Sequence, residues 1–133
     1  MKKRVLLLFT LIFALPILAS EESKEKAVQH LIIADVISME EAKKVFIRNT
    51  SEIKSKKKLN PLELEEIHII TYTLEKSVSY FVENLKGERQ YLAKRIAIAV
   101  EAIHVNAENN HLEETKEHIN IYFNLADKFI SVF

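Results

Sequence analysis

Glycine and proline are almost absent from this chain after its first twenty residues. Beyond that point the sequence holds one glycine, Gly87, and one proline, Pro61. A domain built from many short β-strands needs both residue types in its turns, and too few are present here. The chain therefore has to fold mainly as long helices that are joined by a few short connections.

The first twenty residues, MKKRVLLLFTLIFALPILAS, have the order of features that is typical of an export signal. Three basic residues precede an apolar run from Val5 to Leu18, and the small residues Ala19 and Ser20 close the segment. This run is shorter than the roughly 20 apolar residues that span a bilayer. We expect cleavage after the signal, a periplasmic or secreted protein, and no stable membrane span afterwards.

The rest of the chain is mildly acidic and contains no cysteine. Lys2, Lys3 and Arg4 account for three of the 19 basic residues, so the remaining chain carries 16 basic residues against 19 acidic ones. Nucleic acid is an unsuitable partner for such a chain, because phosphate binding needs a basic face. The lack of cysteine excludes disulfides, a lipid-modified cysteine and covalently attached haem.

Two capping motifs mark the starts of helices. Ser38 and Glu41 form the pattern S-x-x-E, in which each side chain accepts a hydrogen bond from an otherwise unpaired backbone N–H. Further along, Asn60 precedes Pro61 and Glu63. Proline at the first helical position costs nothing, since no intrahelical N–H is needed there. These motifs predict helices that begin at residues 39 and 61.

Two further boundaries divide the second half of the chain. Gly87 interrupts the apolar periodicity, and Asn110 with Glu113 resembles another N-cap and its partner. The predicted helices cover residues 39–57, 61–85, 88–108 and 111–131. Helices of about 20 residues are about 30 Å long, and connections of a few residues make neighbouring helices antiparallel. The prediction is an all-α, up-down-up-down four-helix bundle.

Helical periodicity predicts which side chains form the core. Each helix carries an apolar stripe at intervals of three and four residues. The predicted core positions are Met39, Ala42, Phe46, Asn49 and Ile53; Leu64, Ile67, Thr71, Leu74, Val78, Phe81 and Leu85; Leu92, Ile96, Ala99, Val100, Ile103 and Ala107; and Leu112, Thr115, Ile119, Tyr122, Phe123, Ala126, Phe129 and Ile130.

The predicted domain organisation has three parts. Residues 1–20 form the signal peptide, residues 21–37 form an N-terminal strap or linker, and residues 38–133 form the helical bundle. The segment 21–37 has helix-forming residues at its start and crowded β-branched residues at its end, so helical and irregular conformations are both open. We expect its apolar side chains to lie across the bundle.

Antiparallel pairing places several polar side chains at one level of the bundle. Folding the chain back at Gly87 sets His68 beside His104, and the other two turns bring further polar residues to within about two helical turns along the bundle axis. We expect these residues to form a polar layer that sets the register of the bundle, with their buried groups hydrogen-bonded to one another. The layer comprises Asn49, His68, Tyr72, Glu101, His104 and His118.

Metal binding is the alternative role for this layer. Glu65 with His68, and Glu101 with His104, form E-x-x-H pairs, whose spacing allows a carboxylate and an imidazole to bind one ion. A two-metal site also needs inward glutamates from the first and fourth helices, which the sequence does not offer. One Zn²⁺, Cu²⁺ or Ni²⁺ held by His68 and His104, with Glu101 or His118 as third ligand, remains open.

Three segments and one single residue carry a resemblance to a known family. SMEEA at 38–42, Asn49, EIHIITYTLEKSV at 66–78 and IHVNAE at 103–108 follow an export signal. In this combination the chain resembles an uncharacterised family of short exported bacterial proteins, a domain of unknown function with a segment like EIHELTYTLENAL and a later VH pair. The resemblance covers nearly the whole mature chain.

The resemblance implies a small periplasmic helical bundle with no assigned activity. The residues that match the family pattern are His68, Thr71, Tyr72, Glu75 and His104. Ile69 and Ile70 depart from the pattern, which has an acid and a leucine there. In overall shape the family is similar to cytochrome-type four-helix bundles. The fourth helix of this chain lacks a histidine opposite Met39, so the likeness in shape does not imply haem binding here.

No catalytic motif of the G-x-S-x-G, phosphate-loop or H-E-x-x-H kind occurs. We therefore expect a non-enzymatic binding or structural module without a cofactor, which acts with an unknown protein partner in the cell envelope. The alternative is a metal-binding or metal-sensing bundle centred on His68 and His104.

Overall fold

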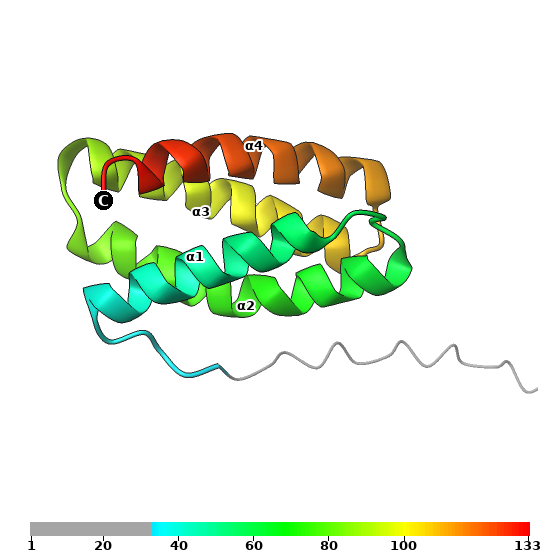
Figure 1. The fold of residues 1–133 in the computed structure, drawn as a ribbon, viewed down its shortest axis with the longest axis horizontal. Coiled ribbons are helices and arrows are strands. Elements are labelled where there is room, and N and C mark those ends of the chain that lie inside the picture. Colours follow the sequence, from blue (N-terminus) through cyan, green and yellow to red (C-terminus); the bar gives the residue numbers. More distant parts are fainter. Residues whose placement is uncertain (1–32) are drawn as a thin grey trace, which may run out of the picture.

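The computed structural model describes residues 33–133 as an all-α four-helix bundle, as predicted (Figure 1). The helices are α1 (Met39–Ser55), α2 (Pro61–Asn84), α3 (Gly87–Glu108) and α4 (Leu112–Ile130). Their ends lie within two residues of the predicted ends. The predicted signal peptide and most of the predicted strap lie outside the described residues. Within the described part, none of the helices combines the length and the apolar character that crossing a membrane requires.

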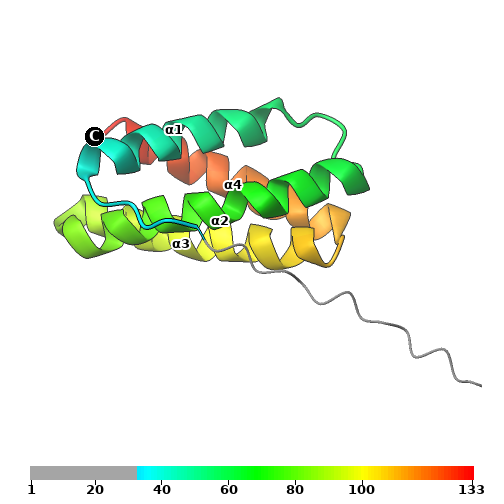
Figure 2. The same cartoon turned by 90° about the horizontal axis from the view of Figure 1, so that it is seen from below.

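The helices form a closed bundle in which α1 and α3 lie on opposite sides (Figure 2). The backbones approach most closely between α2 and α3, then between α3 and α4 and between α1 and α2. The backbones of α1 and α4 lie further apart. Large side chains fill this wider seam. Phe46 on α1 makes edge-to-face contacts with Tyr122 and Phe129 on α4, at ring-centroid distances of 6.2 and 5.5 Å.

The cap of α1 differs from the predicted capping box in one hydrogen bond. Ser38 accepts a hydrogen bond from the backbone N–H of Glu41 at 3.1 Å, as predicted. The Glu41 carboxylate accepts from the N–H of Ile37, also at 3.1 Å, which is one residue before the cap. Two backbone donors near the helix start are therefore satisfied, and the negative charge lies near the positive end of the helix dipole.

The cap of α2 sets the chain direction after α1. Asn60 accepts from the N–H of Glu63 at 2.9 Å, and Pro61 occupies the first turn. The Glu63 carboxylate accepts from the N–H groups of Lys58 and Leu59, at 2.8 and 2.6 Å. Leu59 has a positive φ of 48°. The glutamate therefore holds this turn in a left-handed conformation that leucine rarely adopts.

The predicted cap at Asn110 is wrong. Asn110 has a φ of 57°, and the residue that precedes α4 is His111, whose side chain makes no capping hydrogen bond. Asn110 instead ends the turn after α3, because asparagine tolerates the left-handed conformation at that position. Gly87 also has a left-handed φ, of 63°, and it begins α3. A side chain at Gly87 would strain the turn between α2 and α3.

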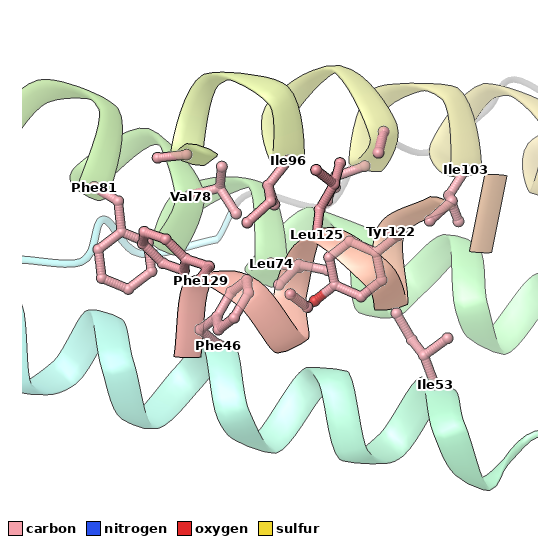
Figure 3. Close-up of a cluster of buried hydrophobic side chains, with 14 of the residues drawn as sticks. Phe46, Ile53, Leu74, Val78, Phe81, Ile96, Ile103, Tyr122, Leu125 and Phe129 are labelled. Carbon is pink, nitrogen blue, oxygen red and sulfur yellow. The ribbon is translucent and has the colours of Figure 1, made fainter. Parts of the chain in front are cut away.

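The core contains side chains from all four helices, and Figure 3 shows the part where Phe46, Phe81 and Phe129 meet. Most predicted core positions are buried, and Met39 and Phe123 are half-buried. Two positions were predicted wrongly, because Leu112 and Ile130 are exposed. They are the first and last residues of α4. An end position has neighbours on one side only, so the periodic pattern overestimates its burial.

The described part of the N-terminal segment, residues 33–38, runs beside α2 without forming a helix. Asp35 accepts a hydrogen bond from the Lys76 ammonium group at 2.6 Å, and Val36 packs against the core. Ile37 is exposed. Val36 therefore contacts the core, Ile33 is half-buried, and a surface ion pair joins the stretch to α2.

Candidate functional site

Three rings from α2 and α3 form one cluster. The ring centroids of His68 and His104 lie 4.8 Å apart, and Tyr72 lies 5.2 Å from His68 and 4.8 Å from His104. His68 and Tyr72 are four residues apart on α2 and therefore share a face. The antiparallel turn at Gly87 brings His104 to their level. Both histidines are buried, with 6% and 9% of their surface exposed.

His104 is oriented by two oxygen atoms from α2. Its Nδ1 lies 2.8 Å from Glu75 Oε1 and 3.1 Å from Thr71 Oγ1. The Thr71 hydroxyl donates its hydrogen to the backbone carbonyl of His68, at 2.5 Å. Because a hydroxyl has only one hydrogen, Thr71 can only accept from His104. Nδ1 of His104 therefore carries the proton and donates to both oxygens.

In the neutral form of the imidazole, which carries one proton, the other ring nitrogen of His104 has a lone pair. This nitrogen, Nε2, lies 4.0 Å from Glu108 Oε2. One ligand atom from each of His68, His104 and Glu108 falls within 4.8 Å of the other two. The Glu108 side chain is 24% exposed, so the group lies at the edge of the core and not at its centre.

Two side chains at the ring cluster, Glu75 and Tyr72, have raised pKa values. Burial raises the pKa of Glu75, His104 lowers it by attraction and hydrogen bonding, and the charge of Glu101 raises it, with a net upward shift. Burial and the nearby charges of Glu108, Glu75 and Glu65 raise the pKa of the Tyr72 phenol. Burial is the largest cause of both shifts, and the carboxylates near the rings add to them. When ionised, these carboxylates attract a cation to this site.

The ligand atoms are close enough for one metal ion after small movements. Two ligands of a tetrahedral zinc ion lie about 3.4 Å apart when the metal–ligand bonds are about 2.1 Å long. The largest separation in the group is below 4.8 Å. Rotations that move side-chain atoms by roughly 1 to 1.5 Å, small changes in χ angles, therefore close the site around an ion.

The structure sets Glu108, and not the predicted Glu101, beside the two histidines. Glu101 is exposed and lines a shallow groove between α2 and α3 together with Glu75, whereas Glu108 joins the two histidines. Side chains on a helix lean toward its N-terminus. Glu108, one turn after His104, therefore leans over that ring, and Glu101 leans away from it.

The remaining members of the predicted polar layer lie apart from the ring cluster. Asn49 is buried on α1, where its Oδ1 accepts from Arg48 Nε at 3.5 Å. His118 is half-buried on α4 and does not belong to the group of close ligand atoms found within residues 33–133. Of the predicted polar layer, only the side chains of His68, Tyr72 and His104 form the ring cluster, and these three lie on α2 and α3.

Glu108 is the site residue that the sequence analysis missed. The signal was present in the sequence, because His104 and Glu108 form an H-x-x-x-E pair at the spacing of adjacent helix turns. The predicted ligands came from E-x-x-H pairs instead. In the first of these pairs, Glu65 Oε2 lies 4.0 Å from His68 Nδ1, but the glutamate side chain is 64% exposed. Glu65 is therefore a solvated neighbour of the cluster.

The comparisons with known proteins place the chain in one family. No curated protein and no solved structure matches it. The model of a family of unknown function, DUF6746, matches residues 1–131. This agrees with the resemblance to an uncharacterised family that the sequence motifs indicated. Because the match covers almost the whole length, the chain belongs to this family of unknown function.

Proposed function

We propose that this protein is an exported, non-enzymatic helical module that binds one transition-metal ion through His68, His104 and Glu108. The observation that carries the proposal is the orientation of His104. Its Nδ1 proton is directed to Glu75 and Thr71, and its Nε2 lone pair faces the Glu108 side. This is how metal-binding histidines are usually held, with a carboxylate on the nitrogen that does not bind the ion.

The ligand types favour particular metals. Two imidazoles and one carboxylate suit Zn²⁺, Cu²⁺ or Ni²⁺ better than Ca²⁺ or Mg²⁺, which prefer sites made entirely of oxygen. Three protein ligands leave a fourth position for water or for a donor from another molecule. The partial exposure of Glu108 gives an ion a route to the site. These features suit metal uptake, storage or sensing.

The export and the lack of enzymatic activity rest on the sequence. Residues 1–20 have the order of a secretion signal, and the chain carries no G-x-S-x-G, phosphate-loop or H-E-x-x-H motif. Mass spectrometry of the protein from the periplasmic fraction of an expressing bacterium tests the first point. We expect a mature N-terminus after residue 19 or 20. A full-length chain that stays in the cytoplasm would reject export.

Titration calorimetry tests the metal site. The tag-free protein, stripped of metal by a chelator, is titrated in turn with Zn²⁺, Cu²⁺ and Ni²⁺. We expect one ion per chain for at least one of these metals. His104→Ala and Glu108→Gln should each weaken binding at least tenfold, because the first removes one of three ligands and the second replaces a charged carboxylate with a weaker neutral oxygen donor. Loss of a ligand costs more than loss of the Glu75 hydrogen bond behind it.

The matched control is His111→Ala. His111 is exposed at the start of α4. Its substitution removes an imidazole, as His104→Ala does, but leaves the ring cluster unchanged. Circular dichroism verifies that each variant keeps its helix content. Equal metal uptake by the wild type, His104→Ala and Glu108→Gln would reject the metal site. The rings would then be a structural polar layer between α2 and α3.

A further inference from the structure

Three exposed apolar side chains follow one line along α3. Tyr91, Ile98 and Val105 are 60%, 73% and 44% exposed. A spacing of seven residues corresponds to two helical turns, so the three side chains lie on one face. Single exposed apolar residues are normal on protein surfaces. A regular line over the length of a helix is instead the pattern of a helix that contacts another helix. We call these three residues the α3 stripe.

The α3 stripe faces away from the bundle core. Ile96 and Ile103 of the same helix point into the core in Figure 3. α3 also lies on the side of the bundle away from α1 (Figure 2). The stripe is therefore presented to the surroundings of the described bundle.

Two opposite charges flank the stripe on one side. Lys94 and Glu101 are exposed and seven residues apart, so they lie on the same flank. Lys94 belongs to the first half of α3 and Glu101 to the second half, since the helix runs from Gly87 to Glu108. The two residues lie at equal distances from the centre of the helix. On the other flank, the Arg95 guanidinium lies over the Tyr91 ring, 5.9 Å from its centroid.

We propose that the α3 stripe is the contact surface of a homodimer in which α3 pairs antiparallel with α3 of a second copy. A two-fold axis through the helix centre sets Ile98 next to its own counterpart and Tyr91 near Val105 of the partner subunit. In antiparallel helices like flanks face each other, so Lys94 lies opposite Glu101 of the partner subunit, and the symmetry repeats this pair. Parallel pairing would instead set opposite flanks against each other, so Lys94 would lie on the side of the partner subunit's Arg95 and not of its Glu101.

The size of the surface predicts a reversible dimer. A helix of 22 residues is about 33 Å long. One helix per subunit buries less than the roughly 800 Å² per partner that is typical of stable complexes. We therefore expect dissociation constants in the micromolar range. The dimer rests on exposed residues outside the metal-binding group, so it stands or falls independently of the metal site.

Analytical ultracentrifugation of the purified metal-free chain, at concentrations up to about 1 mM, is the first test. We expect a monomer–dimer equilibrium. Ile98→Asp should raise the dimer dissociation constant at least tenfold, because it buries a charge at the two-fold axis. The control is Ile47→Asp, since Ile47 is a 49% exposed isoleucine on α1. It should leave the equilibrium within about twofold of the wild type.

Charge exchange tests the antiparallel geometry. Lys94→Glu and Glu101→Lys should each weaken the dimer, because each opposes like charges twice. An equimolar mixture of the two variants should associate better than either alone, since both pairs are then attractive. The double variant should also recover the wild-type equilibrium. Lys44→Glu, an exposed lysine on α1, controls for the change in net charge.

Three results would overturn the proposal. If the protein stayed monomeric over the whole concentration range, the α3 stripe would not be a homodimer contact. If Ile98→Asp and Ile47→Asp changed the dimer dissociation constant equally, the dimer contact would not involve the α3 stripe. A dimer that both single charge variants weaken, but that neither the mixture nor the double variant restores, would exclude the antiparallel pairing.

Discussion

Thr50 on α1 and Tyr122 on α4 are joined by a hydrogen bond of 2.5 Å between their side-chain hydroxyls, in the wide seam between these two helices. Thr50 also donates to the backbone carbonyl of Phe46 at 2.7 Å. Its one hydrogen is used there, so Tyr122 must be the donor in the bond between the helices. Both residues are buried. This bond is a specific polar contact within an otherwise aromatic seam.

Removing the acceptor should cost more than removing the donor. Thr50→Val leaves the Tyr122 hydroxyl buried without its acceptor, and we expect a loss of about 1 to 3 kcal/mol in the free energy of unfolding. Tyr122→Phe keeps the ring packing and leaves Thr50 bonded to Phe46, so about 1 kcal/mol is expected. Urea denaturation followed by circular dichroism measures both. Thr50→Ser retains the hydroxyl as a control, and a larger loss for Tyr122→Phe than for Thr50→Val would contradict the assigned donor.

The same tyrosine predicts a loss of stability at high pH. Burial raises the pKa of Tyr122 above the ordinary value of 10.0, although the hydrogen bond with Thr50 lowers it in part. At a pH between the Tyr122 pKa of the unfolded state and that of the folded state, the folded protein keeps the phenol proton and the unfolded protein has lost it. Stability is therefore full below pH 10 and falls as the pH rises above it, by about 1.4 kcal/mol per pH unit for this group.

Tyr122→Phe lacks this titration, so comparing the two proteins isolates it. The difference in the free energy of unfolding, measured in urea from pH 8 to pH 11.5, should change in favour of the variant above pH 10. The lysines and the remaining tyrosines titrate in both proteins, so their contributions cancel in the difference. A difference that stays constant over this range would mean that the Tyr122 hydroxyl ionises as easily when folded as when unfolded.

Glu75 should act on metal binding without being a ligand. Its carboxylate orients His104, so Glu75→Leu should weaken binding about 10-fold to 100-fold, the usual effect of losing the partner of a metal-binding histidine. Glu75→Gln keeps an oxygen that accepts from Nδ1 and should lose less than Glu75→Leu. Calorimetry of both variants against Glu83→Gln, an exposed glutamate two turns along α2, makes the comparison. Equal affinities for wild type and Glu75→Leu would remove Glu75 from the site.

Phe46 is the residue on which the aromatic seam depends most. It makes ring contacts with Phe81, Tyr122, Phe129 and Phe133, and it is fully buried. Phe46→Ala should lower the free energy of unfolding by about 3 to 5 kcal/mol, because α1 and α4 are too far apart to close the cavity. Thermal and urea melts measure the loss. Ile47→Ala, at the neighbouring exposed position, should change stability by less than about 1 kcal/mol.

The sequence by itself determined the four helices, their direction and most of the core. Local signals carry this information, because caps, the scarcity of glycine and proline, and apolar periodicity act within a few residues along the chain. Local signals were weaker at the helix ends. Asn110 carries a side chain suited both to an N-cap and to a left-handed turn, and the chain before and after it selects the turn.

The tertiary structure decided which polar residues meet. Antiparallel register set His68 level with His104, but rotation of each helix about its axis determines which side chains face each other. That rotation depends on packing at every contact, including the aromatic side chains that hold α1 away from α4. It places Asn49 and His118 outside the ring cluster, and the lean of side chains along α3 brings Glu108, not Glu101, to the two histidines.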